Sequence, residues 1–385
     1  MSSPVAYNFD RWIALKKSIL LIILSLLFIL PINNYKALAY SASAYCLYDP
    51  VLKKVLTSSN MNEKKAMAST TKIMTAFIAC EICDLEKEVE IKPEMIAVEG
   101  SSIGLQVGDK ISIRCLLYGL MLESGNDAAL SLAVSISGSA KNFAVLMNQK
   151  AKNLGLKNTN FVTPNGLDDK NHYSCAYDMA KLSGFAMQNE LFRKIVATKT
   201  YLAVYNNGET KITYYNHNKL LSLLDGADGI KTGFTKKAGR CLVSSCNRNG
   251  VRLIAVTLKA YDDWNDHKVL YRYGFKQYQE IDLPEYNKFI SLLGGKKDRV
   301  QVESENKKIY FYKGLSSYIK KKVYLPNFIY APTNINKPIG YVEYYYNNFL
   351  IAKCNIFAKE NIKEKLQKKK EINFFNIFTQ MFKYI

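Results

Sequence analysis

The stretch Ala66-Met-Ala-Ser-Thr-Thr-Lys-Ile-Met-Thr-Ala-Phe-Ile-Ala79 decides how the rest of the chain is interpreted. Its downstream part is almost entirely apolar or small, which predicts a buried helix that begins close to Ser69. Ser69 and Lys72 are three residues apart, so a helix places them on one face, with their Cβ atoms about 5–6 Å apart. A serine hydroxyl becomes a good nucleophile when a base removes its proton, and a buried lysine with a lowered pKa can be that base.

Two further motifs follow downstream. Ser124-Gly125-Asn126 comes first, and Lys231-Thr232-Gly233 is the only Lys-Thr-Gly in the chain. S-x-x-K alone is a weak signal, because Ser317-Tyr-Ile-Lys320 has the same spacing in a segment that reads as a strand edge. The ordered set of S-x-x-K, S-x-N and K-T-G is typical of serine penicillin-binding enzymes, and it favours Ser69 as the nucleophile.

The N-terminus indicates export. Arg11, Lys16 and Lys17 precede the apolar run Ile19–Leu30, and Ala37-Leu38-Ala39 follows as a small-residue cleavage site. This pattern predicts a secretory signal that is cleaved after Ala39. An uncleaved membrane anchor is the alternative, although the run is short for a span, which needs about 20 residues.

The composition sets limits on domains and partners. The chain has 385 residues, 48% of them hydrophobic, so it is long enough for two domains with a sizeable core. Its net charge is +20. An exported protein does not normally meet nucleic acid, so we expect its positively charged surface to bind anionic lipid headgroups or acidic wall polymers instead. A lysine-rich soluble surface explains the charge equally well.

Eight cysteines in an exported chain raise the question of disulfides. Several lie in apolar helix or strand contexts, where a free cysteine behaves as a small hydrophobic residue, and the number of bridges cannot be derived from spacing. Cys80-Glu-Ile-Cys83 has the spacing of a redox or metal site, but neither a second cysteine pair nor a histidine cluster accompanies it. We expect no metal and no cofactor, since the chain also contains neither a P-loop nor G-x-G-x-x-G.

The order of elements predicts a catalytic region followed by a β domain. Residues 41–60 read as a strand pair, and residues 111–123 as a helix that leads to the S-x-N loop. Residues 239–246 and 251–258 form a strand pair joined by an Asn-Gly turn, and residues 267–278 a helix. From Pro284 to Ala358 only short alternating runs remain, which predicts a small all-β domain.

The last segment, residues 359–385, is lysine-rich and then aromatic. A helix over its end places most of the aromatic side chains opposite Asn373, Asn376, Gln380 and Lys383. Such an amphipathic helix lies in a membrane interface. Docking of the helix against the β domain is the alternative.

These motifs, with their neighbours Asp127, Ala128 and Phe234-Thr235, resemble those of the D-alanyl-D-alanine carboxypeptidases, the low-molecular-weight penicillin-binding proteins of peptidase family S11. The resemblance covers nearly the whole chain. It implies an α/β (α+β) catalytic domain of the transpeptidase/β-lactamase type, in which helices flank an antiparallel sheet beside a helical subdomain. The expected domains are a signal peptide (1–39), the catalytic domain (40–283), a small β-sandwich-like domain (284–358) and an amphipathic membrane-anchoring tail (359–385).

The resemblance also implies a reaction. Ser69 attacks the carbonyl between the two terminal D-alanines of a peptidoglycan stem peptide, and Lys72 accepts its proton as general base. Ser124 and Asn126 line the cleft, where they relay protons and hold the substrate amide. β-Lactam antibiotics inhibit the enzyme by acylating the same serine.

The strand motif would hold the substrate. Lys231 and Thr232 bind the terminal carboxylate, and the charge of Lys231 helps to lower the pKa of Lys72. Gly233 leaves room for the substrate backbone along the strand. The backbone N–H groups of Ser69 and Phe234 form the oxyanion hole.

Two other functions and one other catalytic arrangement are alternatives to this interpretation. A class A β-lactamase shares S-x-x-K and K-T-G, but needs a deacylating glutamate that the segment from Glu190 does not provide in the expected pattern. A non-catalytic wall-binding protein would not need the intact motifs. A Ser-His-Asp triad would have to use His172, His217 or His267, none of which follows a recognisable nucleophile sequence.

Overall fold

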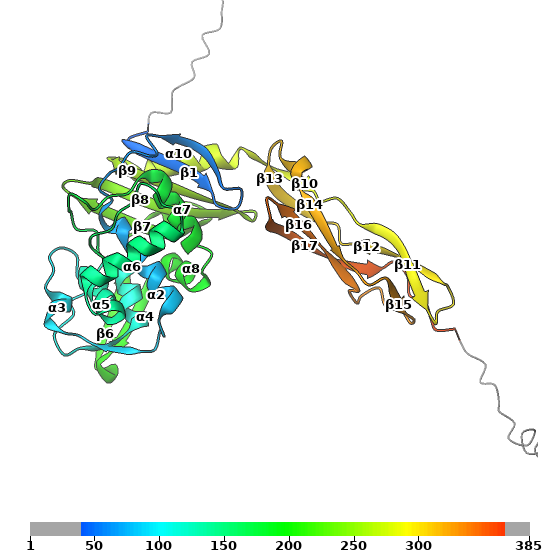
Figure 1. Ribbon diagram of the computed structural model, residues 1–385, viewed down its shortest axis with the longest axis horizontal. Helices are drawn as coiled ribbons and strands as arrows, with labels where there is room; N and C mark the ends of the chain where they lie inside the picture. Colours follow the sequence, from blue (N-terminus) through cyan, green and yellow to red (C-terminus); the bar gives the residue numbers. More distant parts are fainter. Residues whose placement is uncertain (1–39, 366–385) are drawn as a thin grey trace, which may run out of the picture. The chain divides into compact units, whose positions relative to one another are not determined.

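A computed structural model describes residues 40–365. The predicted signal segment, 1–39, and residues 366–385 of the predicted tail lie outside the described residues. The predicted catalytic region is built on a five-stranded antiparallel sheet in the order β2-β1-β9-β8-β7 (Figure 1). Its strands are β1 (Ala44–Asp49), β2 (Lys54–Ser59), β7 (Ala227–Thr235), β8 (Gly239–Arg248) and β9 (Val251–Ala260).

Helices cover both faces of this sheet. Neighbouring residues of a strand point to opposite faces, so Leu47 and Tyr48 of β1 identify the two sides. On the first side lies α10 (Asp263–Phe275), where a Cβ added to Gly274 would come within 2.6 Å of Leu47. On the second side lies α7 (Ala176–Ala186), whose Tyr177 meets the Tyr48 ring edge-on at 6.0 Å. The sheet is therefore buried between helices, as the family resemblance implied.

The second side also carries the helical subdomain, in which α2 (Lys72–Ile82) is buried from Lys72 through Ala79. The other helices are α3 (Pro93–Ile96), α4 (Ile113–Tyr118), the π-helical turn η2 (Gly119–Glu123), α5 (Asn126–Ser137), α6 (Ala140–Asn153), α8 (Glu190–Ala197) and α9 (Leu220–Leu223). Two small two-stranded sheets complete the region: β3 (Glu88–Glu90) with β4 (Lys110–Ser112), and β5 (Thr200–Tyr205) with β6 (Thr210–Tyr215). Among the described residues, no single helix has the length and apolarity of a membrane span, although the bent pair α5 and α6 together reaches both.

Two helix boundaries differ from the prediction. The helix expected over 111–123 begins at Ile113 and widens to π geometry at Gly119. The helix expected over 267–278 begins four residues earlier, where Asp263 and Asp266 place negative charge in the first turn and favour it. It also ends at Phe275, because Tyr278 belongs to strand β10 (Tyr278–Asp282), which pairs with β13 (Lys308–Tyr312).

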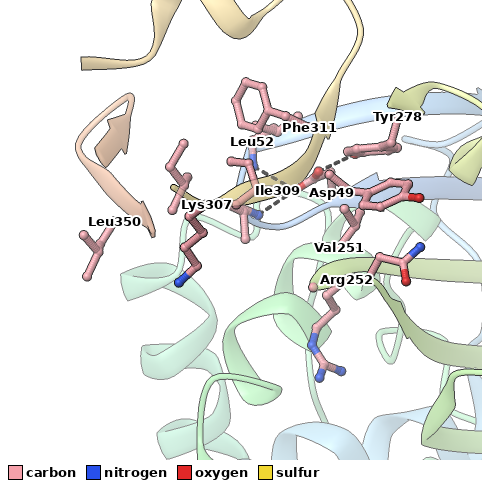
Figure 2. A pocket seen from close by; sticks show the side chains of 14 residues that line it. Asp49, Leu52, Val251, Arg252, Tyr278, Lys307, Ile309, Phe311 and Leu350 are labelled. Atoms are coloured by element: carbon pink, nitrogen blue, oxygen red, sulfur yellow. Dashed lines mark hydrogen bonds between the residues drawn. The ribbon is translucent and has the colours of Figure 1, made fainter. Parts of the chain in front are cut away.

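Tyr278 lies outside the helix, where its hydroxyl donates a hydrogen bond to the buried carboxylate of Asp49. Asp49 is 2% exposed at the end of β1, and its Oδ1 accepts hydrogen bonds from the N–H groups of Val51 and Leu52 at 2.7 and 2.8 Å. The Tyr278 hydroxyl donates to Oδ2 of the same carboxylate. Figure 2 shows these bonds beside a hollow of about 400 Å³. Burial raises the pKa of Asp49, and the three hydrogen bonds oppose this effect.

We expect Tyr278→Phe to destabilise the fold, because it removes one donor from a buried carboxylate. A hydrogen bond to a charged group contributes about 1.5–3 kcal/mol, so the free energy of unfolding should fall by about that amount. A urea titration followed by circular dichroism measures the change. The matched control is Tyr310→Phe at an exposed tyrosine of β13, which should leave the titration unchanged. Equal midpoints for both variants would contradict the assignment.

The β domain is a six-stranded sheet in the order β14-β16-β17-β12-β11-β15. Its strands are β11 (Asn287–Leu293), β12 (Arg299–Ser304), β14 (Lys320–Tyr324), β15 (Phe328–Tyr330), β16 (Gly340–Tyr346) and β17 (Phe349–Ala358). Its core contains Val300, Val302, Val342, Tyr344, Cys354 and Ile356. The predicted small all-β domain is confirmed.

Two sequence features fall in or next to this domain. Residues 359–365, which the sequence assigned to the tail, still pair with it: the Lys359 N–H donates to the Gln301 carbonyl, and Glu364 bridges to Gly295. The second S-x-x-K is split, because Ser317 lies on the exposed 3-10 turn η4 (Ser316–Tyr318) and Lys320 opens β14. All eight cysteines belong to the described residues, and each is a free thiol there.

Candidate active site

Ser69 and Lys72 lie side by side at the start of the buried helix. Ser69 sits in the 3-10 turn η1 (Ala68–Thr71), and Lys72 is the first residue of α2. Lys72 Nζ is 2.9 Å from Ser69 Oγ. Ser69 is partly exposed, whereas Lys72 is fully buried. The hydroxyl is therefore accessible to a substrate while its neighbouring amine is withdrawn from water.

Two oxygen atoms complete the surroundings of the lysine. Nζ donates to Asn126 Oδ1 at 2.7 Å and to the Asn165 carbonyl at 2.8 Å. Burial lowers the pKa of Lys72 well below its ordinary value, and the positive charge of Lys231 lowers it further. An amine in this position can be neutral at a pH where an exposed lysine is charged.

The S-x-N motif reaches the site through an irregular turn. After η2, Ser124 adopts a left-handed conformation with φ 63°, and α5 begins at Asn126. The Asn126 N–H donates to the Ser101 carbonyl at 2.7 Å, and Nδ2 donates to the Glu99 carbonyl at 2.6 Å. Because Nδ2 is engaged there, the amide oxygen is the atom that faces Lys72.

The K-T-G motif lies on β7, beside η1, the turn that carries Ser69. Lys231 is 1% exposed, and burial lowers its pKa to about 7. A Cβ added to Gly233 would lie 2.9 Å from the Ser69 nitrogen and 3.1 Å from the Thr70 nitrogen. We expected Gly233 to leave room for a substrate backbone, and the structure gives an additional reason: the strand passes close to the backbone N–H of Ser69. Phe234 follows with a side chain that is 65% exposed.

Gly233→Ala should therefore slow acylation without unfolding the protein. The added methyl group displaces the Ser69 nitrogen, which is a candidate oxyanion donor. Loss of one such donor costs about 10²–10³-fold in rate. The rate of labelling by a fluorescent penicillin measures the effect, and a thermal melt of the same variant serves as the folding control. Labelling at the wild-type rate would show that this nitrogen takes no part.

A loop that the sequence marked only as a turn contributes to the site. In Thr163-Pro-Asn-Gly166, the carbonyl of Asn165 accepts from Lys72, and that of Pro164 accepts from Thr75 Oγ1 at 2.6 Å. Gly166 has φ +90°, and a Cβ there would come within 2.0 Å of the Ala68 carbonyl oxygen. The Pro-Asn-Gly sequence signalled the turn, but no local pattern could show what it packs against.

The open side of the site is a hollow of about 340 Å³. It is lined by Ser69, Ser101, Ser124, His217, Thr232, Gly233, Phe234, Arg240, Asp263 and Trp264. The structure thus gathers all three motifs around one space. The sequence missed Arg240, Asp263 and Trp264, which no motif marks.

Arg240 is the fixed positive charge of this hollow. It lies opposite Phe234 in the β7–β8 pair, and its Nε and Nη2 donate to Asp263 Oδ1 at 3.0 and 2.6 Å. Its side chain remains 42% exposed, and the guanidinium lies 5.7 Å from the centre of the Trp264 ring. A guanidinium that is oriented on one side and open on the other can receive an anion.

The three histidines form no catalytic triad with Ser69. His172 is buried and lies 2.8 Å from Thr71 Oγ1, while its Nδ1 accepts from the Val162 N–H; burial lowers its pKa to about 4. His267 is buried between Ser244 and Thr257, and burial lowers its pKa to about 3. His217 lines the hollow and pairs with Glu123 at 3.2 Å, which the sequence did not indicate.

Comparison with known proteins identifies this arrangement. The family model described as D-alanyl-D-alanine carboxypeptidase, peptidase S11, matches residues 32–262. The chain belongs to this family. A second model, described as the C-terminal domain of penicillin-binding protein 5, matches residues 284–364 and accounts for the β domain. The resemblance inferred from the three motifs is confirmed.

Individual S11 carboxypeptidases match most of the chain. The D-alanyl-D-alanine carboxypeptidase DacF of Bacillus subtilis is 33% identical over 341 residues, which are 85% of this chain and 87% of that protein. The crystal structure of penicillin-binding protein 5 from Haemophilus influenzae has a TM-score of 0.60 at 30% identity, covering 85% of this chain and 98% of the other. The Streptomyces K15 DD-transpeptidase has a TM-score of 0.59 at 34% identity, and covers 62% of this chain and 98% of its own. The described residues hold no cluster of histidine, cysteine, aspartate and glutamate suited to a metal ion.

Proposed function

We propose that Ser69 is the acylated serine through which this S11 enzyme removes the terminal D-alanine of peptidoglycan stem pentapeptides. The chain is a serine D-alanyl-D-alanine carboxypeptidase of the penicillin-binding class, as its family and relatives indicate. The observation that carries the assignment to Ser69 is the contact of its Oγ with a buried lysine, whose other two contacts are both with oxygen acceptors.

That contact pattern supports Lys72 as the general base. A neutral amine has two N–H bonds and one lone pair. The two N–H bonds are used by Asn126 Oδ1 and the Asn165 carbonyl, so the lone pair is directed toward Ser69 Oγ. The hydroxyl proton then passes to Nζ while Oγ attacks the carbonyl carbon of the penultimate D-alanine.

The rest of the reaction follows from this geometry. The carbonyl oxygen becomes an oxyanion, which the N–H groups of Ser69 and Phe234 stabilise. When the tetrahedral intermediate collapses, the C–N bond breaks, and Ser124 relays a proton from Lys72 to the departing D-alanine. Water then hydrolyses the ester on Ser69 by the same proton path, which regenerates the hydroxyl and the neutral amine.

The substrate carboxylate would lie between β7 and Arg240. Thr232 and Arg240 both line the hollow, and Lys231, which precedes Thr232 on β7, is buried. With a pKa lowered to about 7, Lys231 carries only part of a positive charge at neutral pH. The Arg240 guanidinium is held by Asp263 on one side and is open to the hollow on the other, so we assign it the larger share of carboxylate binding. β-Lactams, which carry a carboxylate in the same relation to their reactive carbonyl, would occupy the same hollow.

Mass analysis of a stem pentapeptide tests the function. Incubation with the protein should release one D-alanine and stop at the tetrapeptide. A β-lactamase would instead turn over benzylpenicillin many times and leave the pentapeptide intact. A non-catalytic wall-binding protein would change neither molecule. Either result would refute the proposal.

The location of the enzyme follows from its substrate, which lies outside the cytoplasmic membrane. We infer that residues 1–39 direct export, and that residues 366–385 attach the protein to the anionic outer face of that membrane. The lysines that precede the aromatic run attract anionic headgroups, and the aromatic face enters the interface. A chain that ends after Lys365 tests the attachment, because this cut leaves the paired residues 359–365 in place.

A further inference from the structure

The β domain has an exposed apolar surface where two neighbouring strands meet. β15 pairs in parallel with β11, so that Ser291 lies opposite Phe328 and Leu293 opposite Tyr330. Side chains alternate along each strand, and the outward positions are Phe289, Ser291 and Leu293 on β11 and Phe328 and Tyr330 on β15. The four apolar residues among them, Phe289, Leu293, Phe328 and Tyr330, form what we call the edge patch, and they are 64%, 43%, 44% and 69% exposed, respectively.

Residues of the edge patch lie next to one another on adjacent strands rather than singly on the surface. Phe328 and Tyr330 contact each other edge-on at 5.6 Å, and the register places Tyr330 beside Leu293. The inward residues of the same strands, Ile290 and Leu292, belong to the core and hold the strands in place. Single exposed apolar residues are ordinary, but a group of them on adjacent strands marks an interaction surface.

Positive charge surrounds the same end of the domain. Backbone hydrogen bonds join three segments there: Ala331 donates to Leu293, Lys296 to Lys363, and Thr333 to Ile362. Within residues 294–298, 331–337 and 359–365, six exposed lysines outnumber three acidic residues. The lysines are Lys296, Lys297, Lys337, Lys359, Lys363 and Lys365, and the acidic residues are Asp298, Glu360 and Glu364. Lys297 forms an ion pair with Glu360, and Lys359 with Glu303 of β12, so the excess of positive charge comes from the other four lysines. Ile335, 42% exposed, adds an aliphatic side chain.

The chain also leaves the β domain at this end. The N–H of Lys365, the last described residue, donates to the carbonyl of Gly294, which directly follows Leu293. Figure 1 shows β11 and β15 at the end of the domain where the described chain stops. Residues 366–385, with their five phenylalanine and tyrosine side chains, therefore begin next to the edge patch.

We propose that the edge patch and the lysines around it bind the surface of an anionic lipid bilayer, as a folded contact separate from the tail. Phenylalanine and tyrosine are favoured at the level of the lipid headgroups, and aliphatic side chains such as Leu293 and Ile335 enter the acyl boundary. Lysines near the surface are attracted to anionic headgroups. This combination fits a bilayer better than a glycan strand, because aliphatic side chains offer a sugar no stacking face. Two contacts would restrict how the β domain turns on the membrane.

Vesicle binding of the full chain tests the proposal. The Phe328→Ser/Tyr330→Ser double variant should bind vesicles of phosphatidylglycerol and phosphatidylcholine at least about tenfold more weakly, a change of about 1.4 kcal/mol. The matched control is Tyr318→Ser/Leu350→Ser, at two residues of the same domain that are 65% and 53% exposed but lie outside the patch. The control should bind within about twofold of the wild type. Equal binding by both double variants would refute the proposal.

A reporter within the patch gives a direct readout. Phe328→Trp should show a blue-shifted emission on anionic vesicles and quenching by brominated lipid, after the wild-type signal is subtracted. The same response should persist in a chain that ends after Lys365, at higher lipid concentration, because the patch contact does not require the tail. An emission that vesicles leave unchanged would overturn the assignment.

Other occupants of the patch give different results. If residues 366–385 covered it, the emission of the Phe328→Trp variant would already be blue-shifted without lipid and would red-shift on truncation. If a second copy covered it, sedimentation velocity would show a dimer that the double variant loses. If a wall glycan bound it, purified peptidoglycan rather than vesicles would retain the protein. Each of these outcomes excludes the lipid contact, and none affects penicillin labelling, which separately reports the active site.

Discussion

Ser69→Ala should abolish covalent labelling by a fluorescent penicillin, whereas the wild type is labelled stoichiometrically. The β-lactam carbonyl can form a stable ester only with a hydroxyl that has lost its proton, and Ser69 Oγ lies 2.9 Å from a buried amine that can take it. Alanine removes the attacking atom and leaves the buried surroundings of η1 almost unchanged. A gel that resolves the labelled protein measures the result, and a thermal melt shows that the variant is folded.

Two other serines provide matched controls. Ser317 has a lysine three residues later, but it lies on an exposed turn of the β domain, so Ser317→Ala should be labelled like the wild type. Ser124 lines the same hollow as Ser69, and Ser124→Ala should be labelled slowly rather than not at all, because it loses only a proton relay. If Ser69→Ala were fully labelled and either control lost its labelling, the nucleophile would be a serine other than Ser69.

The sequence predicted which residues the structure brings together at the candidate site, but it did not predict what surrounds them. S-x-x-K, S-x-N and K-T-G occupy three separate elements, and only their order in the chain indicated that η1, the start of α5 and β7 would meet. Ser69, Lys72, Asn126 and Lys231 needed no knowledge of distance, because each belongs to a motif whose chemistry requires it. The strand pairs at both ends of the catalytic region and the small β domain followed from the alternating runs and the turns between them, whereas the single antiparallel sheet was implied by the family resemblance.

Three features of the structure could not be predicted from the sequence, because each depends on contacts between segments that are far apart in the chain. The Asn165 carbonyl reaches Lys72 across 93 residues of chain, and any residue could have supplied that backbone oxygen. Arg240 was one charged residue among many until the β7–β8 register placed it opposite Phe234. Tyr278 continued a helical pattern in sequence, but the buried carboxylate of Asp49 and the pairing with Tyr312 made it part of a strand. Tertiary contacts overrode the local pattern in each case.

The Lys72→Arg variant should be nearly inactive, although it keeps a positive charge at the same position. A guanidinium does not give up its proton in the physiological range, so it cannot accept one from Ser69. General-base catalysis contributes about 10²–10⁴-fold, and the rate of penicillin acylation should fall by at least this factor. The larger planar group must also fit a fully buried site, so a thermal melt accompanies the measurement. Lys141→Arg, at an exposed position of α6, is the matched control and should acylate normally.

The pH dependence of the wild-type enzyme also tests whether Lys72 is the general base. Burial and the charge of Lys231 lower the pKa of Lys72, and only its neutral form is a base. Acylation should therefore be slow in acid, rise as the pH passes the lowered pKa, and then level off. Lys231, with a pKa lowered to about 7, loses its charge across the neutral range, so binding of a carboxylate substrate should weaken as the pH rises further. The dependence of kcat/KM on pH should thus be bell-shaped, while the maximal acylation rate only rises to a plateau. An active Lys72→Arg variant, or an acylation rate that does not change with pH, would exclude Lys72 as the base.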